Sequence, residues 1–361
     1  MSLRELRRRI GRLAIVGFEG HAPSVELREI AREFDLGGVI YFARNIAEPA
    51  QVKEMSRETA SLARDWPLWI SVDQEGGRVA RLKRPFTEWP PMQTLGRATG
   101  AQLTARFAAA LADELLAVGI NLDYTPVLDI HTNPKNPVIG DRAFSDRAER
   151  VAELGTIMIE TLQAAGVAAC GKHFPGHGDT STDSHLELPL VEHPPDRLDA
   201  VEMVPFRAAI AADVAFIMTA HVLVPSLDEE RPATLSPVVV DDWLKQKLGY
   251  RGVVLSDDLG MKAISATLGL GEAMVQALVA GCDAALLCNE PAAAQVAALE
   301  DVIRAVESGR IPVKRVEDAL ARQERVKAQF LGKDRRRPDV PMSRIGCADH
   351  QRLAETMAEW R

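Results

Sequence analysis

Residues 167–185 have the sequence VAACGKHFPGHGDTSTDSH, in which a short apolar run leads into a loop rich in ionisable groups. The run from Val167 to Cys170 is typical of a short buried strand. The segment that follows contains three histidines, two aspartates and a lysine, and it has almost no apolar side chains to bury. Loops of this kind, held on a rigid scaffold, often carry catalytic groups. We therefore expect a functional site at the end of this strand.

The chemistry of this loop has several interpretations. It could be a solvated loop with no further role, or its Gly-His-Gly backbone could cradle a phosphate. Four of its side chains are also acceptable ligands for zinc or iron: His173, His177, Asp183 and His185. Alternatively, Asp183 and His185 form an acid–base dyad, because residues i and i+2 of an extended segment share a face and the carboxylate can then orient the imidazole. The residues alone do not separate the metal site from the dyad.

Similar short apolar runs recur along the chain, and helical patterns lie between most of them. The predicted strands are residues 13–18, 38–42, 67–73, 121–130, 167–172, 215–220, 252–257 and 284–288. Apolar strands separated by helices favour parallel pairing in a sheet that is buried on both faces. Eight such units favour an α/β fold of the (β/α)8 TIM-barrel type over an open doubly wound sheet. No Gly-x-Gly-x-x-Gly motif follows the first strand, which argues against a dinucleotide-binding fold.

The predicted helices are residues 25–34, 50–65, 102–118, 146–165, 197–212 and 240–248, with 292–306 and 313–330 closing the barrel. There is no linker, internal repeat or shift in composition, so we expect one catalytic barrel over residues 1–335. Residues 336–361 are expected to form a C-terminal tail whose short helix, near residues 349–360, packs on or near the barrel. The charge run Lys333–Pro338 is typical of a solvated surface segment.

The composition limits the classes of function. The chain has 361 residues, 47% of them hydrophobic, and a formal net charge of −8, which argues against a nucleic-acid-binding protein. No run is long enough for a membrane span or a signal-peptide core, so we expect a cytoplasmic protein with no membrane partner. The four cysteines show no spacing typical of a metal site or a disulfide framework. We expect the protein to be a monomer.

Charged residues stand at or just after the carboxyl ends of five predicted strands. They are Asp73, Asp129, Lys172, His221 and Asp257. In a (β/α)8 barrel, the rim formed by these strand ends carries the catalytic groups. The five residues are therefore candidates for a single site.

The segment Asp73–Arg81 follows the third strand and contains two adjacent glycines, which allow a sharp turn or a close approach of the backbone to a ligand. Asp73 could bind sugar hydroxyls, and Arg78 or Arg81 could bind a carboxylate or an amide oxygen. The alternative is a loop held together by its own Asp–Arg and Glu–Arg pairs.

Two more segments add candidates at other strand ends. Asn136–Phe144 follows the fourth strand and contributes Arg142. In Ser256–Met261, only one of Asp257 and Asp258 can face the barrel lumen, because adjacent strand residues point to opposite faces. The other could cap the helix that follows. Sequence periodicity does not say which residue has which role.

Three segments together resemble glycoside hydrolase family 3, and within it the NagZ-type branch of single-domain bacterial β-N-acetylglucosaminidases. They are Asp73–Arg81, Lys172–His185 and Ser256–Met261. The most specific string is Lys-His-Phe-Pro-Gly-His-Gly-x-x-x-x-Asp-Ser-His, of which this chain keeps every fixed position. The resemblance covers about residues 10–330, in the same order.

The resemblance implies roles for individual residues. Asp257 matches the aspartate after serine that serves as nucleophile in the family, and Asp258 does not. His185 matches the histidine that these N-acetylglucosaminidases use as acid/base, with Asp183 as its partner. The family's sugar-binding positions are matched by Asp73, Arg81, Arg142, Lys172 and His173. No metal or other cofactor is implied.

The function implied by the resemblance is that of a retaining exo-β-N-acetylglucosaminidase, a β-N-acetylhexosaminidase that forms a covalent glycosyl-enzyme. The implied substrate is a peptidoglycan fragment, GlcNAc joined β-1,4 to anhydroMurNAc with or without a peptide, and the implied role is cell-wall recycling in the cytoplasm. Two other interpretations stay open. One is a β-GlcNAc phosphorylase on the same scaffold, because a histidine acid/base tolerates an incoming phosphate. The other is a barrel that binds sugar without catalysis.

Overall fold

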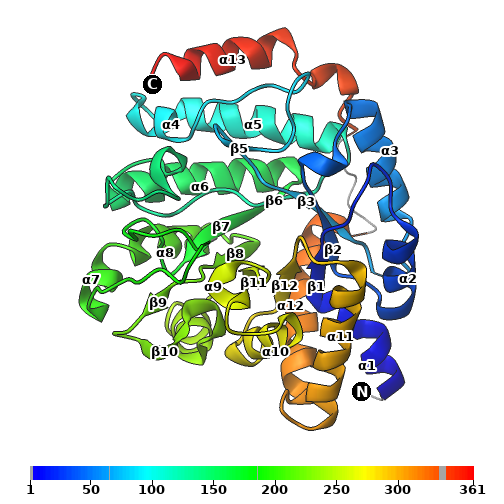
Figure 1. Cartoon of the computed structure of the whole chain (residues 1–361). Helices are drawn as coiled ribbons and strands as arrows, with labels where there is room; N and C mark the ends of the chain where they lie inside the picture. Colours follow the sequence, from blue (N-terminus) through cyan, green and yellow to red (C-terminus); the bar gives the residue numbers. More distant parts are fainter. Residues whose placement is uncertain (1–2, 65, 185, 333–338) are drawn as a thin grey trace.

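The structure is a computed structural model that describes residues 3–64, 66–184, 186–332 and 339–361. Within them, eight parallel strands close into a barrel surrounded by helices (Figure 1). Around the barrel the strands follow the order β1, β12, β11, β8, β7, β6, β3, β2. Their bounds are β1 Ala14–Val16, β2 Gly38–Tyr41, β3 Trp69–Val72, β6 Leu122–Asp123, β7 Ala168–Phe174, β8 Phe216–Thr219, β11 Val253–Asp258 and β12 Ala284–Leu287. The predicted (β/α)8 fold is confirmed.

The barrel strands are apolar because both of their faces are buried. Alternate residues such as Ile15, Leu122 and Leu255 form one core cluster, whereas their neighbours, such as Val16, belong to a second cluster shared with the helices. This alternation is the two-residue period of a strand applied to two apolar environments. The core inside the barrel is well packed, since the rings of Trp69 and Phe216 meet edge to face with centroids 5.1 Å apart.

The main helices around the barrel are α2 Val25–Phe34, α3 Pro49–Ala60, α5 Gln102–Ala117, α6 Ala148–Ala165, α8 Met203–Ala211, α10 Leu270–Ala280, α11 Ala292–Glu307 and α12 Val313–Leu331. Shorter helices are α1 Leu3–Arg9, α4 Gln93–Arg97, α7 Pro195–Ala200 and α9 Lys262–Ser265. A π-helical segment, Val238–Lys247, precedes β11 in the chain. Among the described residues, no helix has both the length and the apolar character that a membrane span requires.

The structure differs from the sequence prediction at a few elements. The fourth strand, predicted over residues 121–130, is only Leu122–Asp123. Beyond it, the chain meets β7 through a hydrogen bond from the Cys170 N–H to the Thr125 carbonyl and through the bridge between Val127 and Lys172. Pro126 has no backbone N–H to donate to a sheet, which shortens the ladder there. The predicted helix 197–212 is divided into α7 and α8, and α10 was not predicted.

Two small antiparallel ribbons were also not predicted. One joins β4 Gln74–Gly76 to β5 Val79–Ala80, and the other joins β9 Leu223–Val224 to β10 Asp228–Pro232. Both follow barrel strands on the carboxyl side, so they stand above the rim where the candidate residues were expected. The first ribbon, the β4–β5 hairpin, carries part of the segment Asp73–Arg81.

The last helix, α13 Ala348–Ala358, packs along α5 and α4 at the outside of the barrel (Figure 1). The predicted charge run over residues 333–338 lies outside the described residues. The division into a barrel over 1–335 and a tail over 336–361 stays a prediction.

Candidate active site

A cavity with a volume of about 390 Å³ opens at the carboxyl ends of the barrel strands. Six of the eight residues predicted for the site line it: Asp73, Arg81, Arg142, Lys172, His173 and Asp257. They come from the segments after β3 and β6, from β7 itself and from β11. Because parallel strands present their carboxyl ends at one rim, residues far apart in the chain meet there.

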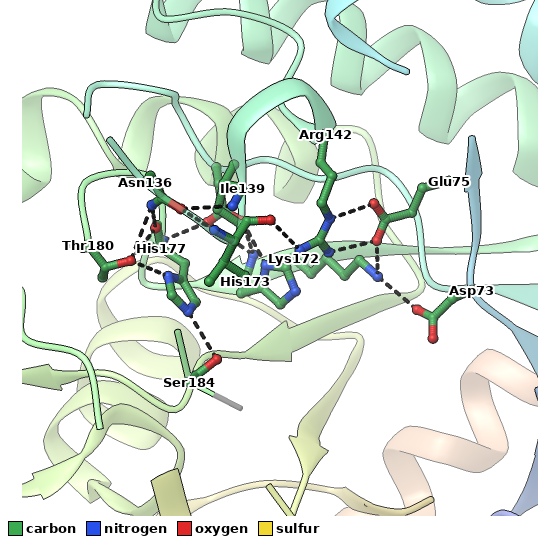
Figure 2. Close-up of polar contacts among 12 residues, drawn as sticks. Asp73, Glu75, Asn136, Ile139, Arg142, Lys172, His173, His177, Thr180 and Ser184 are labelled. Atoms are coloured by element: carbon green, nitrogen blue, oxygen red, sulfur yellow. Dashed lines mark hydrogen bonds and ion pairs between the residues drawn. The ribbon is translucent and has the colours of Figure 1, made fainter. Parts of the chain in front are cut away.

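One wall of the cavity is a network of four charged side chains (Figure 2). The Lys172 amine lies 2.9 Å from an oxygen of Asp73 and 2.6 Å from an oxygen of Glu75. Arg142 binds both oxygens of Glu75, with Nε 2.9 Å from one and Nη2 2.8 Å from the other. The network pairs two cations with two anions, and its buried members are satisfied by each other.

The charges in this network reinforce one another. Burial alone would raise the pKa of Glu75, but the charges of Arg142 and Lys172 hold it well below its ordinary value. Burial alone would likewise lower the pKa of Lys172, but Asp73 and Glu75 raise it. Glu75, Lys172 and Arg142 are therefore ionised at neutral pH, and the wall offers fixed donors and acceptors to a polar ligand.

Glu75 was not predicted as a site residue. It stands in a segment with other charged residues, and the sequence gives no indication that it is almost fully buried, 1% exposed, between Arg142 and Lys172. Its position follows from the β4–β5 hairpin, which turns the segment back over the rim. The alternative of internal ion pairs in this loop is thus partly correct, since Arg81 also lies 3.3 Å from Asp73.

The two glycines of the hairpin approach the chain itself. A Cβ atom on Gly76 would lie 2.8 Å from the carbonyl oxygen of Pro90, and one on Gly77 would lie 2.9 Å from Cβ of Pro91. Both glycines have positive φ angles, 102° and 57°, a region that side chains rarely adopt. The two glycines therefore allow a tight turn that packs on the segment Trp89–Met92.

Asp129 holds the end of β7 and the start of the histidine loop, defined as residues 175–184. Its carboxylate lies 2.7 Å from Nδ1 of His173 and accepts the backbone N–H of His177 at 2.6 Å. Burial alone would raise the pKa of Asp129, but the His173 imidazole and these hydrogen bonds hold it below its ordinary value. A charged carboxylate therefore orients the His173 ring, which lines the cavity.

His177 is part of the same loop and was considered as a metal ligand. Both of its ring nitrogens have protein partners (Figure 2): Nδ1 lies 2.6 Å from the Thr180 hydroxyl and Nε2 lies 3.1 Å from the Ser184 hydroxyl. Burial lowers its pKa to about 4, so the ring is neutral at physiological pH. No group of three or more potential ligands in the described part of the chain could hold a metal ion.

Asp257 lies at the end of β11 and is half-buried at the cavity. One of its oxygens accepts the backbone N–H of Asp258 at 2.8 Å. Burial alone would raise its pKa, but the imidazoles of His221 and His173 and this hydrogen bond hold it below its ordinary value. The result is an ionised carboxylate in the lining of the cavity.

Asp258 also borders the cavity, but one of its carboxylate oxygens, Oδ1, is hydrogen-bonded to the backbone and the other accepts from the Asn289 side chain. Oδ1 accepts the N–H groups of Gly260 at 3.2 Å and Cys288 at 3.1 Å, which ties β11 to the end of β12. Burial raises its pKa. The prediction that the second aspartate caps the following helix is wrong, because α9 has Met261 at its N-cap and no side-chain cap.

The predicted dyad is only partly described. His185 lies outside the described residues. Asp183 is not among the residues that line the cavity, whereas Ser184, the residue between them, is. The carbonyl of Ser184 accepts the N–H of Ala263 at 3.2 Å, so this part of the loop is held beside α9, directly after β11.

Known proteins are similar to this chain in sequence and in fold. A sequence model described as "Glycosyl hydrolase family 3 N terminal domain" matches residues 5–326. The chain is 34% identical over 361 residues to beta-hexosaminidase A of Pseudoalteromonas piscicida, a match that covers 92% of this chain but only 60% of that protein.

Solved structures with the same fold include a glycoside hydrolase family 3 β-N-acetylglucosaminidase from Paenibacillus sp. str. FPU-7. It matches with a TM-score of 0.93 and 43% identity, over 100% of this chain and 69% of that chain. NagZ from Neisseria gonorrhoeae in complex with N-trifluoroacetyl-D-glucosamine matches with a TM-score of 0.78 and 31% identity, over 96% of this chain and 97% of that chain.

Proposed function

Because this chain belongs to glycosyl hydrolase family 3 and is a β-N-acetylhexosaminidase, we propose that it releases terminal β-linked GlcNAc by a retaining mechanism. The observation that supports this most directly is the ionised Asp257 in the same cavity as the network of Asp73, Glu75, Lys172 and Arg142. The volume of about 390 Å³ lies near the lower end of the range for ligand pockets, about 300–1,000 Å³. Such a pocket suits one monosaccharide unit.

The sugar is held by hydrogen bonds to its hydroxyl and N-acetyl groups. In our proposal Asp73, Arg81, Arg142, Lys172 and His173 make these contacts. Carboxylates accept from hydroxyls, whereas Lys and Arg donate to hydroxyl or carbonyl oxygens. The ion pairs between these residues fix their positions before substrate arrives, so less ordering is needed on binding.

Asp257 is the nucleophile of the proposed reaction. It attacks the anomeric carbon and forms a glycosyl-enzyme ester while the bond to the leaving group breaks. A nucleophilic carboxylate must be ionised, and the lowered pKa of Asp257 meets this requirement. Water then attacks the same carbon, and the two inversions return GlcNAc with the β configuration.

His185 supplies and removes the proton in these two steps. It protonates the departing oxygen and then takes a proton from the attacking water, with Asp183 orienting its ring. An imidazole suits both roles because its ordinary pKa, about 6.5, is close to working pH. As a cationic acid it also places no second negative charge beside Asp257.

We further propose that the natural substrate is a peptidoglycan fragment, GlcNAc β-1,4-linked to anhydroMurNAc with or without a peptide. In this proposal the enzyme acts in cell-wall recycling in the cytoplasm, and it needs no metal or other cofactor. NagZ of Neisseria gonorrhoeae, bound to an N-acylated glucosamine, supports an amino-sugar ligand for this cavity.

Turnover of an aryl β-GlcNAc glycoside, followed by NMR with and without phosphate, tests the proposed reaction. We expect β-GlcNAc as the first product in both conditions, and loss of turnover by at least about 10³-fold in Asp257→Ala. GlcNAc-1-phosphate as the main product would identify a phosphorylase instead. Tight sugar binding without any turnover would identify a non-catalytic sugar-binding barrel.

A further inference from the structure

The C-terminal segment, defined as residues 339–361, is attached to the barrel by a buried carboxylate. Glu114 of α5 is 2% exposed, and its two oxygens accept four hydrogen bonds. Two come from this segment, from the backbone N–H of Gly346 at 3.0 Å and from Nδ1 of His350 at 2.9 Å. The other two come from Thr87, whose N–H and hydroxyl donate at 3.0 and 2.6 Å. One carboxylate thus joins the end of the chain to the loop after β5.

The tautomer of His350 follows from its partners. Nδ1 faces a carboxylate and must donate, whereas Nε2 lies 3.1 Å from a guanidinium nitrogen of Arg344 and must accept. His350 is 2% exposed. The ring therefore bridges Arg344 and Glu114.

The C-terminal segment also presses on the loop that contains Thr87. A Cβ atom on Gly346 would lie 2.1 Å from the carbonyl oxygen of Pro85, so the two backbones are in direct contact. The His350 ring lies 6.0 Å from the ring of Trp89, centroid to centroid. The segment Pro85–Met92 is held from outside by the end of the chain.

The other side of Pro85–Met92 supports the β4–β5 hairpin. The backbone N–H of Gly77 donates to the carbonyl of Trp89 at 2.8 Å, and the hairpin glycines leave no room for a side chain against Pro90 and Pro91. The hairpin begins directly after Asp73 and carries Glu75 into the cavity wall. Contacts therefore connect His350, through Trp89 and the β4–β5 hairpin, to the charged wall of the cavity.

We propose that the C-terminal segment positions the β4–β5 hairpin for sugar binding, and that His350 is a positioning residue of the enzyme. This inference rests on the proposed function of the cavity. Loss of the His350 donor leaves the buried Glu114 carboxylate short of one hydrogen bond, which is costly in a site closed to water. The end of the chain then loosens, and the hairpin loses the support that keeps Asp73 and Glu75 against Lys172.

The test compares three variants of the full chain on an aryl β-GlcNAc glycoside. In His350→Ala we expect KM to rise about 10-fold, the loss typical of one misplaced hydrogen bond to a charged group, with kcat within about threefold. His350→Asn keeps a donor near the position of Nδ1 and should restore most of the affinity. Val302→Ala, at a buried site of α11, is the control for lost stability and should leave KM unchanged.

Binding of GlcNAc by calorimetry gives a second readout, which does not require turnover. We expect a matching loss of affinity in His350→Ala and normal affinity in Val302→Ala. An unchanged KM and GlcNAc affinity in His350→Ala, or equal effects in the control, would overturn the proposal. Absence of β-GlcNAc turnover in the unmodified enzyme is a different result, because it would refute the proposed function itself.

Discussion

Asp123 is a buried aspartate at the end of β6, next to the charged wall of the cavity. Its Oδ1 accepts the backbone N–H of Gln74 at 2.9 Å, and Oδ2 has no hydrogen-bond partner among the described residues. Burial raises its pKa to about 8, although Lys172 partly opposes the shift. The folded protein therefore carries a protonated Asp123 at neutral pH, beside a wall in which Glu75 is ionised.

The Asp123→Asn variant should become more stable than the wild-type protein by a margin that grows as the pH rises. Between the ordinary pKa of 3.8 and the folded value of about 8, folded Asp123 keeps a proton that the unfolded chain has released. Unfolding then releases a proton, so the wild-type stability falls as the pH increases through this window. Asparagine keeps the acceptor for Gln74 and has no such proton.

The measurement is the free energy of unfolding of both proteins by denaturant titration at pH 5 and pH 8. We expect the advantage of Asp123→Asn to grow by roughly 3–4 kcal/mol between these pH values. A difference that does not change with pH would mean that Asp123 is ionised in the folded protein.

Single residues of the site could be predicted when a motif fixes their place in the chain. Asp73, Arg142, Lys172 and Asp257 were predicted from strand ends and from family resemblance, and all line one cavity. Glu75 could not be predicted, because its role depends on a hairpin that folds over the rim. The roles of Asp183 and His185 stay predictions.

The histidine loop, residues 175–184, is held closely by the segment after β6. Asn136 donates to the carbonyl of His177 at 2.8 Å, and Thr132 donates to Asp179 at 2.9 Å. A Cβ atom on Gly178 would lie only 1.7 Å from the carbonyl oxygen of Ile130. The loop therefore reaches its place over the cavity only because residue 178 has no side chain.

Gly178→Ala should impair catalysis by moving this loop. The added methyl group must displace either the loop or the segment after β6, and Ser184 and His177 both line the cavity. A shift of about 1 Å in an active site can cost about 100-fold in rate, so we expect kcat/KM on an aryl β-GlcNAc glycoside to fall by about that factor.

Gly269→Ala is the matched control for this prediction. A Cβ atom at Gly269 meets nothing within 4 Å, and the glycine stands at the N-cap of α10, away from the cavity lining. We expect normal kcat/KM and a change in stability below about 1 kcal/mol. Normal activity in Gly178→Ala would show that the loop position observed here is not needed for turnover.

Among helices and strands, the sequence predictions were most accurate where burial alone determines the pattern of apolar and polar residues. The helix predicted over residues 25–34 has these bounds in the structure, with the Ser24 side chain accepting the N–H of Leu27 at its N-cap. The buried barrel strands were also found from their apolar runs. The fourth strand was overestimated because Pro126, which has no N–H, interrupts its ladder. The ribbons above the rim were missed because tertiary contacts, not local periodicity, produce them.

The two ends of the barrel differ: the end with the amino ends of the strands is closed, whereas the end with their carboxyl ends opens into the cavity. At the amino ends of the strands, the Lys327 amine of α12 donates to the carbonyls of Gly37 and Pro67 at 2.7 and 2.5 Å and lies over the rings of Trp66 and Trp69. At the carboxyl ends, the cavity collects the charged residues. This polarity could be predicted from sequence, because the charged candidates follow the apolar runs and do not precede them.

Trapping the reaction intermediate tests the central claim that Asp257 is the nucleophile. A 5-fluoro β-GlcNAc fluoride slows both steps of a retaining glycosidase but has a good leaving group, so the glycosyl-enzyme should accumulate. We expect one added sugar per chain, located by peptide mass spectrometry on Asp257 and absent in Asp257→Ala. Attachment of the sugar to another residue, or turnover to GlcNAc with inverted configuration, would contradict this account.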